Sequence, residues 1–196
     1  MSQYTIVGAG GEIINGIDVP DGEHLALNTP QGATAIKGFP ADWQSYYAAG
    51  AWVSKGAQPS PVYVWNAATK LWTDPRTLAQ QQDDKWNQIK ASRDAVIDAP
   101  LVTPYGTFDS YADARANIAD AVLLSRTSTD MGSPINIVFT LADNTTVTLN
   151  LTAMETVGLM LGAKVQTARG TGTTLRTQIY ATTDSTTLNA ITWPVT

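Results

Sequence analysis

The chain has 196 residues, of which 43% are hydrophobic and 15% are charged, and it contains no cysteine. The lack of cysteine excludes disulfides and cysteine metal sites, and a net charge of −5 without a cluster of lysines and arginines argues against nucleic-acid binding. The most apolar segment, residues 157–165, is interrupted by glycine and lysine and is far shorter than the roughly 20 residues of a membrane span.

The first 73 residues have the pattern of short strands separated by turns. Gly8–Gly11 is expected to be the turn of a hairpin, and Val19-Pro20-Asp21-Gly22 predicts another turn. Residues 37–61 are rich in proline, glycine and serine and are expected to be open. The pattern predicts strands at residues 4–7, 12–14, 24–27, 33–36, 62–65 and 70–72, the fourth pairing with the third.

Helices dominate from residue 74 onward. Asp74 as the N-cap, followed by Pro75, predicts a helix that ends near Ile97, before Pro100. Thr152 to Glu155 has the pattern of a capping box. The pattern predicts hairpins at residues 101–108 and 135–151, and further helices at residues 110–125, 152–167, 173–182 and 185–191.

These elements predict an α+β fold. We expect a small β-rich N-terminal domain (residues 1–73), a long connecting helix (74–98), and a C-terminal part (99–196) in which helices pack with a β-hairpin.

Candidate chemical motifs have simpler explanations. Gly8–Gly11 lacks the third glycine of a dinucleotide-binding fingerprint and has no room for the helix that follows, so a hairpin turn is favoured. His24 is the only histidine and has no hydrolase motif beside it. Asp83 and Asp84 are adjacent on a predicted helix and so diverge, and Asp143-Asn144 predicts a β-turn. We therefore expect no catalytic residue, no cofactor and no metal.

Two groups of residues stand out as structural or interface candidates. Trp43, Tyr46, Tyr47 and Trp52 are aromatic residues in a segment with few aliphatic side chains, and they predict either a partner interface or an internal core. The second group is a stripe at i, i+3, i+4 and i+7 of a helix, followed by Asp94: it comprises Trp86, Ile89, Lys90 and Arg93. We expect Trp86 and Ile89 to pack inward, and Arg93 to bind a carboxylate or a carbonyl.

The stripe opens a series of motifs that continues to the end of the chain. W-x-x-I-K-x-x-R-D at residues 86–94 precedes Gly106-Thr107-Phe108-Asp109, Asn117-Ile118, Phe139-Thr140-Leu141-Ala142-Asp143-Asn144-Thr145 and Ala190-Ile191-Thr192-Trp193-Pro194. The series resembles a domain of unknown function found at the C-terminus of many bacteriophage tail and fibre-region proteins, over roughly residues 80–194. The resemblance implies no catalytic residue, because none is known for that family.

The resemblance implies one of two functions. The first is a non-enzymatic structural protein of the virion, in the tail tip, the baseplate or the tail-fibre attachment region. The second is a tail-fibre assembly chaperone that is not retained in the virion. The low charge and the β-rich N-terminal part favour the first function, whose expected partners are other tail or tail-fibre proteins and further copies in a symmetric assembly. Such a protein is made in the host cytoplasm and located in the viral tail.

Overall fold

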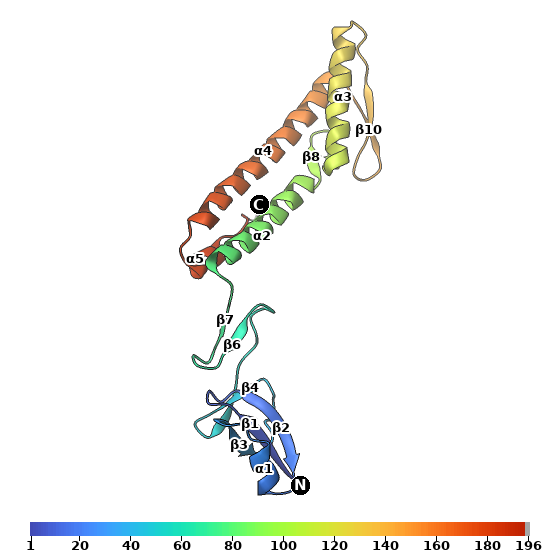
Figure 1. Ribbon diagram of the computed structural model, residues 1–196. Helices are drawn as coiled ribbons and strands as arrows, with labels where there is room; N and C mark the ends of the chain where they lie inside the picture. Colours follow the sequence, from blue (N-terminus) through green and yellow to red (C-terminus); the bar gives the residue numbers. More distant parts are fainter. Residues whose placement is uncertain (195–196) are drawn as a thin grey trace. The chain divides into compact units, whose positions relative to one another are not determined.

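The computed structural model describes residues 1–194 and consists of two compact units, Met1–Arg76 and the chain from Thr77 onward (Figure 1). Helices make up 43% and strands 24%, and strands prevail in the first unit, which confirms the predicted α+β class. No helix among the described residues has the length and apolar character needed to cross a membrane. The helix predicted as a connection belongs to the second unit.

A three-stranded antiparallel sheet holds the core of the first unit. Its strands β1 (Ser2–Val7), β2 (Ile13–Val19) and β3 (Thr34–Lys37) lie in the order β2-β1-β3. The β1–β2 hairpin confirms the prediction. The central strand supplies Ile6 and Val7, and β2 supplies Val19, as buried apolar side chains.

The segment after β2 corrects a prediction. Residues 24–27 were predicted to form a strand, but Gly22–Leu27 is the short helix α1. The Asp21 carboxylate accepts a hydrogen bond of 3.0 Å from the His24 amide, and this N-cap favours the helix. β3 therefore pairs with β1 rather than with residues 24–27, so the predicted partner of this strand was also wrong.

Two further hairpins complete the first unit. The pair β6 (Val64–Asn66) and β7 (Leu71–Thr73) confirms a predicted hairpin, whereas β4 (Ser45–Ala48) and β5 (Ala51–Ser54) lie in the segment predicted to be open. Ala49 and Gly50 join β4 to β5 with φ of 50° and 84°, the pattern of a type I′ turn. Because alanine rarely adopts positive φ, the sequence gives no signal of this turn.

The helix α2 (Leu78–Asp98) begins three residues later than the first helical residue predicted, Pro75. Thr77, and not Asp74, is the N-cap, and it forms a capping box with Gln80. Asp74 instead binds the Arg76 side chain, with 2.9 Å from Nε to Oδ1, and this contact lowers the pKa of the Asp74 carboxyl. The predicted cap was therefore wrong, while the end of the helix agrees with the prediction.

One long helix replaces two predicted ones. α4 runs without a break from Leu151 to Ala181, and its N-cap is Asn150 rather than Thr152. Residues 168–172, the gap between the two predicted helices, lie inside this helix. α2 and α4 run alongside each other in opposite directions (Figure 1), and the Gln82 side chain at the start of α2 donates to the Thr182 carbonyl over 3.1 Å.

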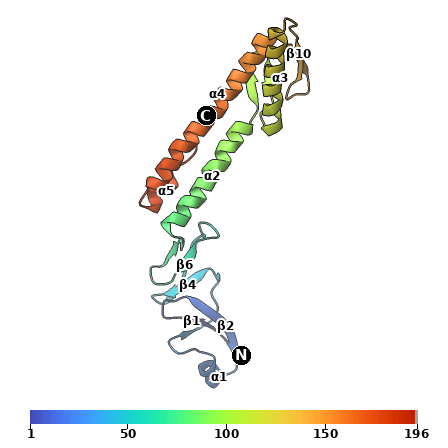
Figure 2. The ribbon, with the colours of Figure 1, turned by 45° about the horizontal axis from the view of Figure 1, so that its top comes forward.

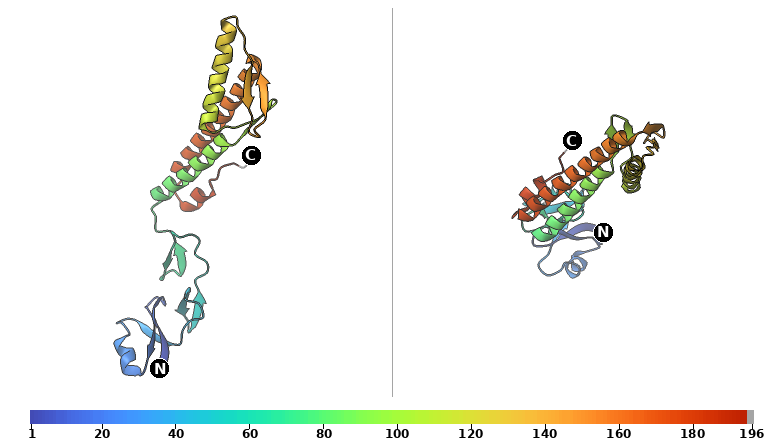
Figure 3. Two further views of the ribbon diagram at one scale, coloured as in Figure 1. Left: turned by 90° about the vertical axis from the view of Figure 1, so that its right-hand side faces the viewer. Right: turned by 90° about the horizontal axis from the view of Figure 1, so that it is seen from above.

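The remaining elements of the second unit surround the first half of α4. They are β8 (Leu101–Thr103), β9 (Gly106–Phe108), α3 (Ala112–Asp130), β10 (Ile137–Thr140) and β11 (Thr146–Leu149), and all were predicted. Figure 3 shows the β10–β11 hairpin beside α3 and α4. A buried cluster joins these elements to α4, and its side chains include Phe108, Ile118, Leu149, Met154 and Val157.

A second buried cluster joins the other end of α4 to α2. α5 (Ser185–Ala190), which was also predicted, follows α4 and turns back beside the start of α2 (Figure 2). Ile89 of α2, Ile179 of α4 and Leu188 of α5 form this cluster. The second unit is therefore held by one cluster at each end of its long helix pair.

Candidate functional site

The Trp86 stripe lies at the contact between α2 and α4. Ile89 is buried, and Trp86 is partly buried against the same cluster. Two cations lie near the indole, with Lys90 Nζ at 5.8 Å and the Arg176 guanidinium at 5.6 Å from the ring centroid. Both distances are within the range of cation–π attraction, so Trp86 attracts one cation of α2 and one of α4.

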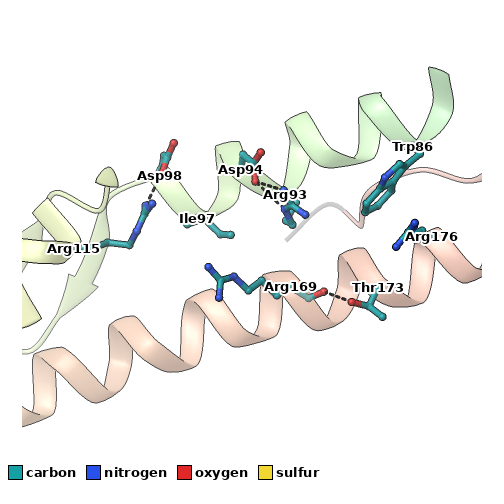
Figure 4. A pocket seen from close by; sticks show the side chains of 9 residues that line it. All are labelled: Trp86, Arg93, Asp94, Ile97, Asp98, Arg115, Arg169, Thr173 and Arg176. Atoms are coloured by element: carbon teal, nitrogen blue, oxygen red, sulfur yellow. Dashed lines mark hydrogen bonds and ion pairs between the residues drawn. The ribbon is translucent and has the colours of Figure 1, made fainter. Parts of the chain in front are cut away.

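Next to this stripe a cavity of about 630 Å³ opens between α2 and α4 (Figure 4). We call it the arginine groove, because four of the six arginines in the chain line it. Figure 4 shows Trp86 and Arg93 extending from α2 toward α4, with Arg169 on the opposite helix. The lining consists of Trp86, Arg93, Asp94, Ile97, Asp98, Arg115, Arg169, Thr173 and Arg176.

Two of the four arginines are held by aspartates of α2. The Arg93 guanidinium lies 2.7 Å from the Asp94 carboxylate, and Arg115 lies 2.6 Å from that of Asp98. Arg115 also donates to the carbonyl of Ser110. These contacts fix the direction of both guanidinium groups, and each group has five N–H donors, so donors remain for a ligand.

The other two arginines project from α4. Neither Arg169 nor Arg176 forms an ion pair with a carboxylate among residues 1–194, and both side chains are exposed. Arg176 lies between two rings, 5.6 Å from the Trp86 centroid and 5.9 Å from that of Tyr180. With four arginines and two aspartates, the groove carries a net charge of +2 in a chain whose net charge is −5.

A glycine shapes the wall of the groove. Gly172 is buried in α4, and a Cβ atom built on it would lie 3.2 Å from Cδ of Arg93. The absence of a side chain here lets the stem of Arg93 lie against α4. α2 and α4 therefore lie close together beside the groove.

The predicted aromatic interface separates into three ring contacts in the first unit. Tyr47 and Trp52 face each other across the β4–β5 hairpin with centroids 5.0 Å apart. Tyr46 points to the other face of that hairpin, as expected for neighbouring residues of a strand, and contacts Trp65 at 5.3 Å. Trp43 is 50% exposed and lies 5.6 Å from Phe39. Tyr46 thus packs internally, and the interface role of the group stays a prediction.

The glycine-rich turn has a structural explanation. Gly8 to Gly11 close the β1–β2 hairpin, where the Gly8 amide donates to the Glu12 carbonyl over 2.9 Å. The Gly11 carbonyl accepts a hydrogen bond of 2.8 Å from the Tyr47 amide, and this bond connects the turn to β4. The turn therefore packs the β1–β2 hairpin against the β4–β5 hairpin.

The other chemical candidates also have structural roles. His24 lies 2.7 Å from Asp21 at the start of α1, and its amide and ring lower the pKa of the Asp21 carboxyl. Asp143 caps the β10–β11 turn by accepting from the Thr145 amide at 3.0 Å. Within residues 1–194, no group of three histidine, aspartate or glutamate side chains is arranged to hold a metal ion.

Sequence reasoning found only part of the arginine groove. Trp86, Arg93 and Asp94 were singled out because they are close in the sequence. Arg115, Arg169 and Arg176 were missed because they join the groove only through the pairing of α2 with α4 and the position of α3. The i, i+7 spacing of Arg169 and Arg176 could have indicated a shared face, but only in one continuous helix.

The chain was then compared with known proteins. A family model described as "Domain of unknown function (DUF4376)" matches residues 80–192, which is more than half of the chain and includes every lining residue of the arginine groove. No curated protein matches the chain, and no solved structure matches it.

Proposed function

The chain belongs to the DUF4376 family, and we propose that it is a non-enzymatic structural protein of a bacteriophage tail. In this role it occupies the tail tip, the baseplate or the tail-fibre attachment region and contacts other tail proteins. The tail assignment is supported by the ordered motif series between Trp86 and Pro194. The further parts of the proposal are assembly with copies of itself and a location in the virion.

The observation that carries the interaction role is the number of unpaired strand edges. Among the described residues, the first unit contains two two-stranded sheets, β4–β5 and β6–β7, and β5, β6 and β7 each have one edge without a partner strand. Such edges offer backbone N–H and C=O groups to a strand of another protein. A protein that docks by strand addition needs this arrangement.

Exposed apolar side chains support the same role. Leu71 of β7 is 62% exposed, and in the second unit Leu123 and Leu159 are each at least 64% exposed. Large apolar side chains on the surface favour contact with other proteins. With charged residues at 15%, the surface also repels neighbouring subunits weakly.

Quantitative mass spectrometry of gradient-purified phage particles tests the proposal. We expect the chain at a fixed ratio to the other tail proteins. If it is abundant in the infected-cell lysate but absent from particles, the structural role is wrong and the assembly chaperone is the better explanation. If it is found in neither, the tail assignment itself fails.

A pair of variants tests docking through strand edges. Leu71→Lys places a charge on β7 of the first unit, and we expect it to lower the copy number in particles because edge charges oppose strand addition. Val102→Lys makes the same change on the equally short strand β8 of the second unit and should leave incorporation unchanged. Equal incorporation of both variants would contradict docking by β7.

A further inference from the structure

We propose that the arginine groove binds an acidic segment of a partner protein. The inference deepens the proposed function and rests on its interaction role, because it names the chemistry of one partner. Its ligand is a peptide segment whose aspartate or glutamate side chains reach Arg169 and Arg176.

The two arginines of α4 supply the free positive charge. Neither is paired with a carboxylate among the described residues, and guanidinium groups bind carboxylates in a bidentate geometry. They are seven positions apart on one helix, which separates them by roughly 10 Å along its axis and places them on the same face. Acidic side chains on one face of an extended segment lie about 7 or 13 Å apart, which brackets this spacing.

The two arginines of the opposite wall are already oriented. Arg93 and Arg115 are fixed by Asp94 and Asp98, so a ligand meets them without the entropy loss of ordering two long side chains. Trp86 offers an apolar face on which the methylene groups of a glutamate side chain can pack. The groove thus combines oriented donors, free cations and one aromatic surface.

The same aspartates favour a peptide over a nucleic acid. A nucleic-acid strand carries a charge at every phosphate, and a continuous row of negative charges would meet the carboxylates of Asp94 and Asp98. A peptide can place neutral or basic residues opposite these carboxylates and acidic ones opposite the arginines. The overall charge of −5 also opposes the approach of a long polyanion.

Fluorescence anisotropy of a labelled Glu-Ser-Glu-Ser-Glu peptide, in which acidic and neutral residues alternate, with the 196-residue chain tests the inference. We expect saturable binding to one site, weakened as the salt concentration rises. The double variant Arg169→Gln/Arg176→Gln should bind at least about tenfold more weakly, because two charge-assisted contacts are lost. Both side chains are exposed, and circular dichroism of the variant checks that its fold is unchanged.

Arg126→Gln is the matched control. Arg126 is an exposed arginine of α3 that pairs with Glu155 and does not line the groove, so this variant should bind the peptide within about twofold of the parent chain. Loss of binding in both variants to the same extent would show attraction to net charge alone and would overturn the inference.

Two other outcomes would also overturn it. The first is no saturable binding of the Glu-Ser-Glu-Ser-Glu peptide. The second is tighter binding of a six-nucleotide single-stranded oligonucleotide, which would assign the groove to nucleic acid. The titration uses the purified chain, so absence from phage particles would contradict the tail role without changing its result.

Discussion

At the scale of single residues, two buried serines differ in one respect. The Ser110 hydroxyl donates to the Ile97 carbonyl over 2.8 Å, whereas the Ser125 hydroxyl has no hydrogen-bond partner among the described residues. Both side chains are fully buried. Ser110→Ala should lower the free energy of unfolding by about 1–2 kcal/mol because it leaves a buried carbonyl unpaired, whereas Ser125→Ala should be neutral or stabilising. Urea denaturation of the two variants measures this difference, and an equal loss in both would contradict it.

A second pair of variants tests the glycine-rich turn. Gly11 has φ of +76°, and a Cβ atom built on it would lie 2.0 Å from the Tyr47 carbonyl oxygen. Gly50 has a similar φ of +84° but nothing within 4 Å. Gly50→Ala should therefore cost only the backbone term of about 1 kcal/mol, and Gly11→Ala should cost at least about twice as much. Thermal melting of the full chain compares them, and equal costs would show that the contact with β4 adds nothing.

At the scale of elements, alanine substitutions test how the glycines inside α4 affect the stability of this helix. Gly170 is exposed inside the helix with nothing within 4 Å of a built Cβ. Gly170→Ala should raise the free energy of unfolding by roughly 1 kcal/mol, because alanine loses less backbone entropy in a helix. Gly172→Ala should raise the free energy of unfolding by less than this, or lower it, because its Cβ would lie 3.2 Å from Cδ of Arg93. A loss of helix signal in Gly170→Ala by circular dichroism would contradict the continuous helix.

The elements that the sequence predicted correctly are those with local signals. Alternating apolar residues identified the β10–β11 hairpin, helical periodicity identified α3, and Pro100 marked the end of α2. The errors have tertiary or short-range causes: the cap at Asp21 turns residues 24–27 into α1, and α4, packed against α2, continues through residues 168–172 between the two predicted helices. The β4–β5 hairpin was missed because Ala49 adopts a positive φ.

At the scale of the whole molecule, the candidate site shows what a sequence pattern cannot predict. Trp86 and Arg93 were identified because they share one face of one helix. Their relation to Arg169 and Arg176 depends on contacts between residues about ninety positions apart, such as that between Trp86 and Arg176. The periodicity of α4 places its two arginines on one face, but only the pairing with α2 makes that face a groove.

The two units should differ in their stability when separated. The second unit contains both buried clusters, one around Phe108 and Met154 and one around Ile89, whereas the first unit buries only Ile6, Val7 and Val19 among its large apolar residues. A small unit with so little buried apolar surface is marginal by itself.

Residues 77–196 alone should therefore unfold cooperatively in urea, and residues 1–76 alone should show weak chemical-shift dispersion. Because the unpaired edges of β5, β6 and β7 belong to the first unit, we expect it to provide the docking contacts. The fragment 77–196 should then fail to join phage particles that incorporate the full chain, measured by mass spectrometry of particles from a complemented deletion strain. Incorporation of this fragment at the copy number of the full chain would show that docking resides in the second unit, and a cooperative transition in residues 1–76 would show that its few buried side chains suffice.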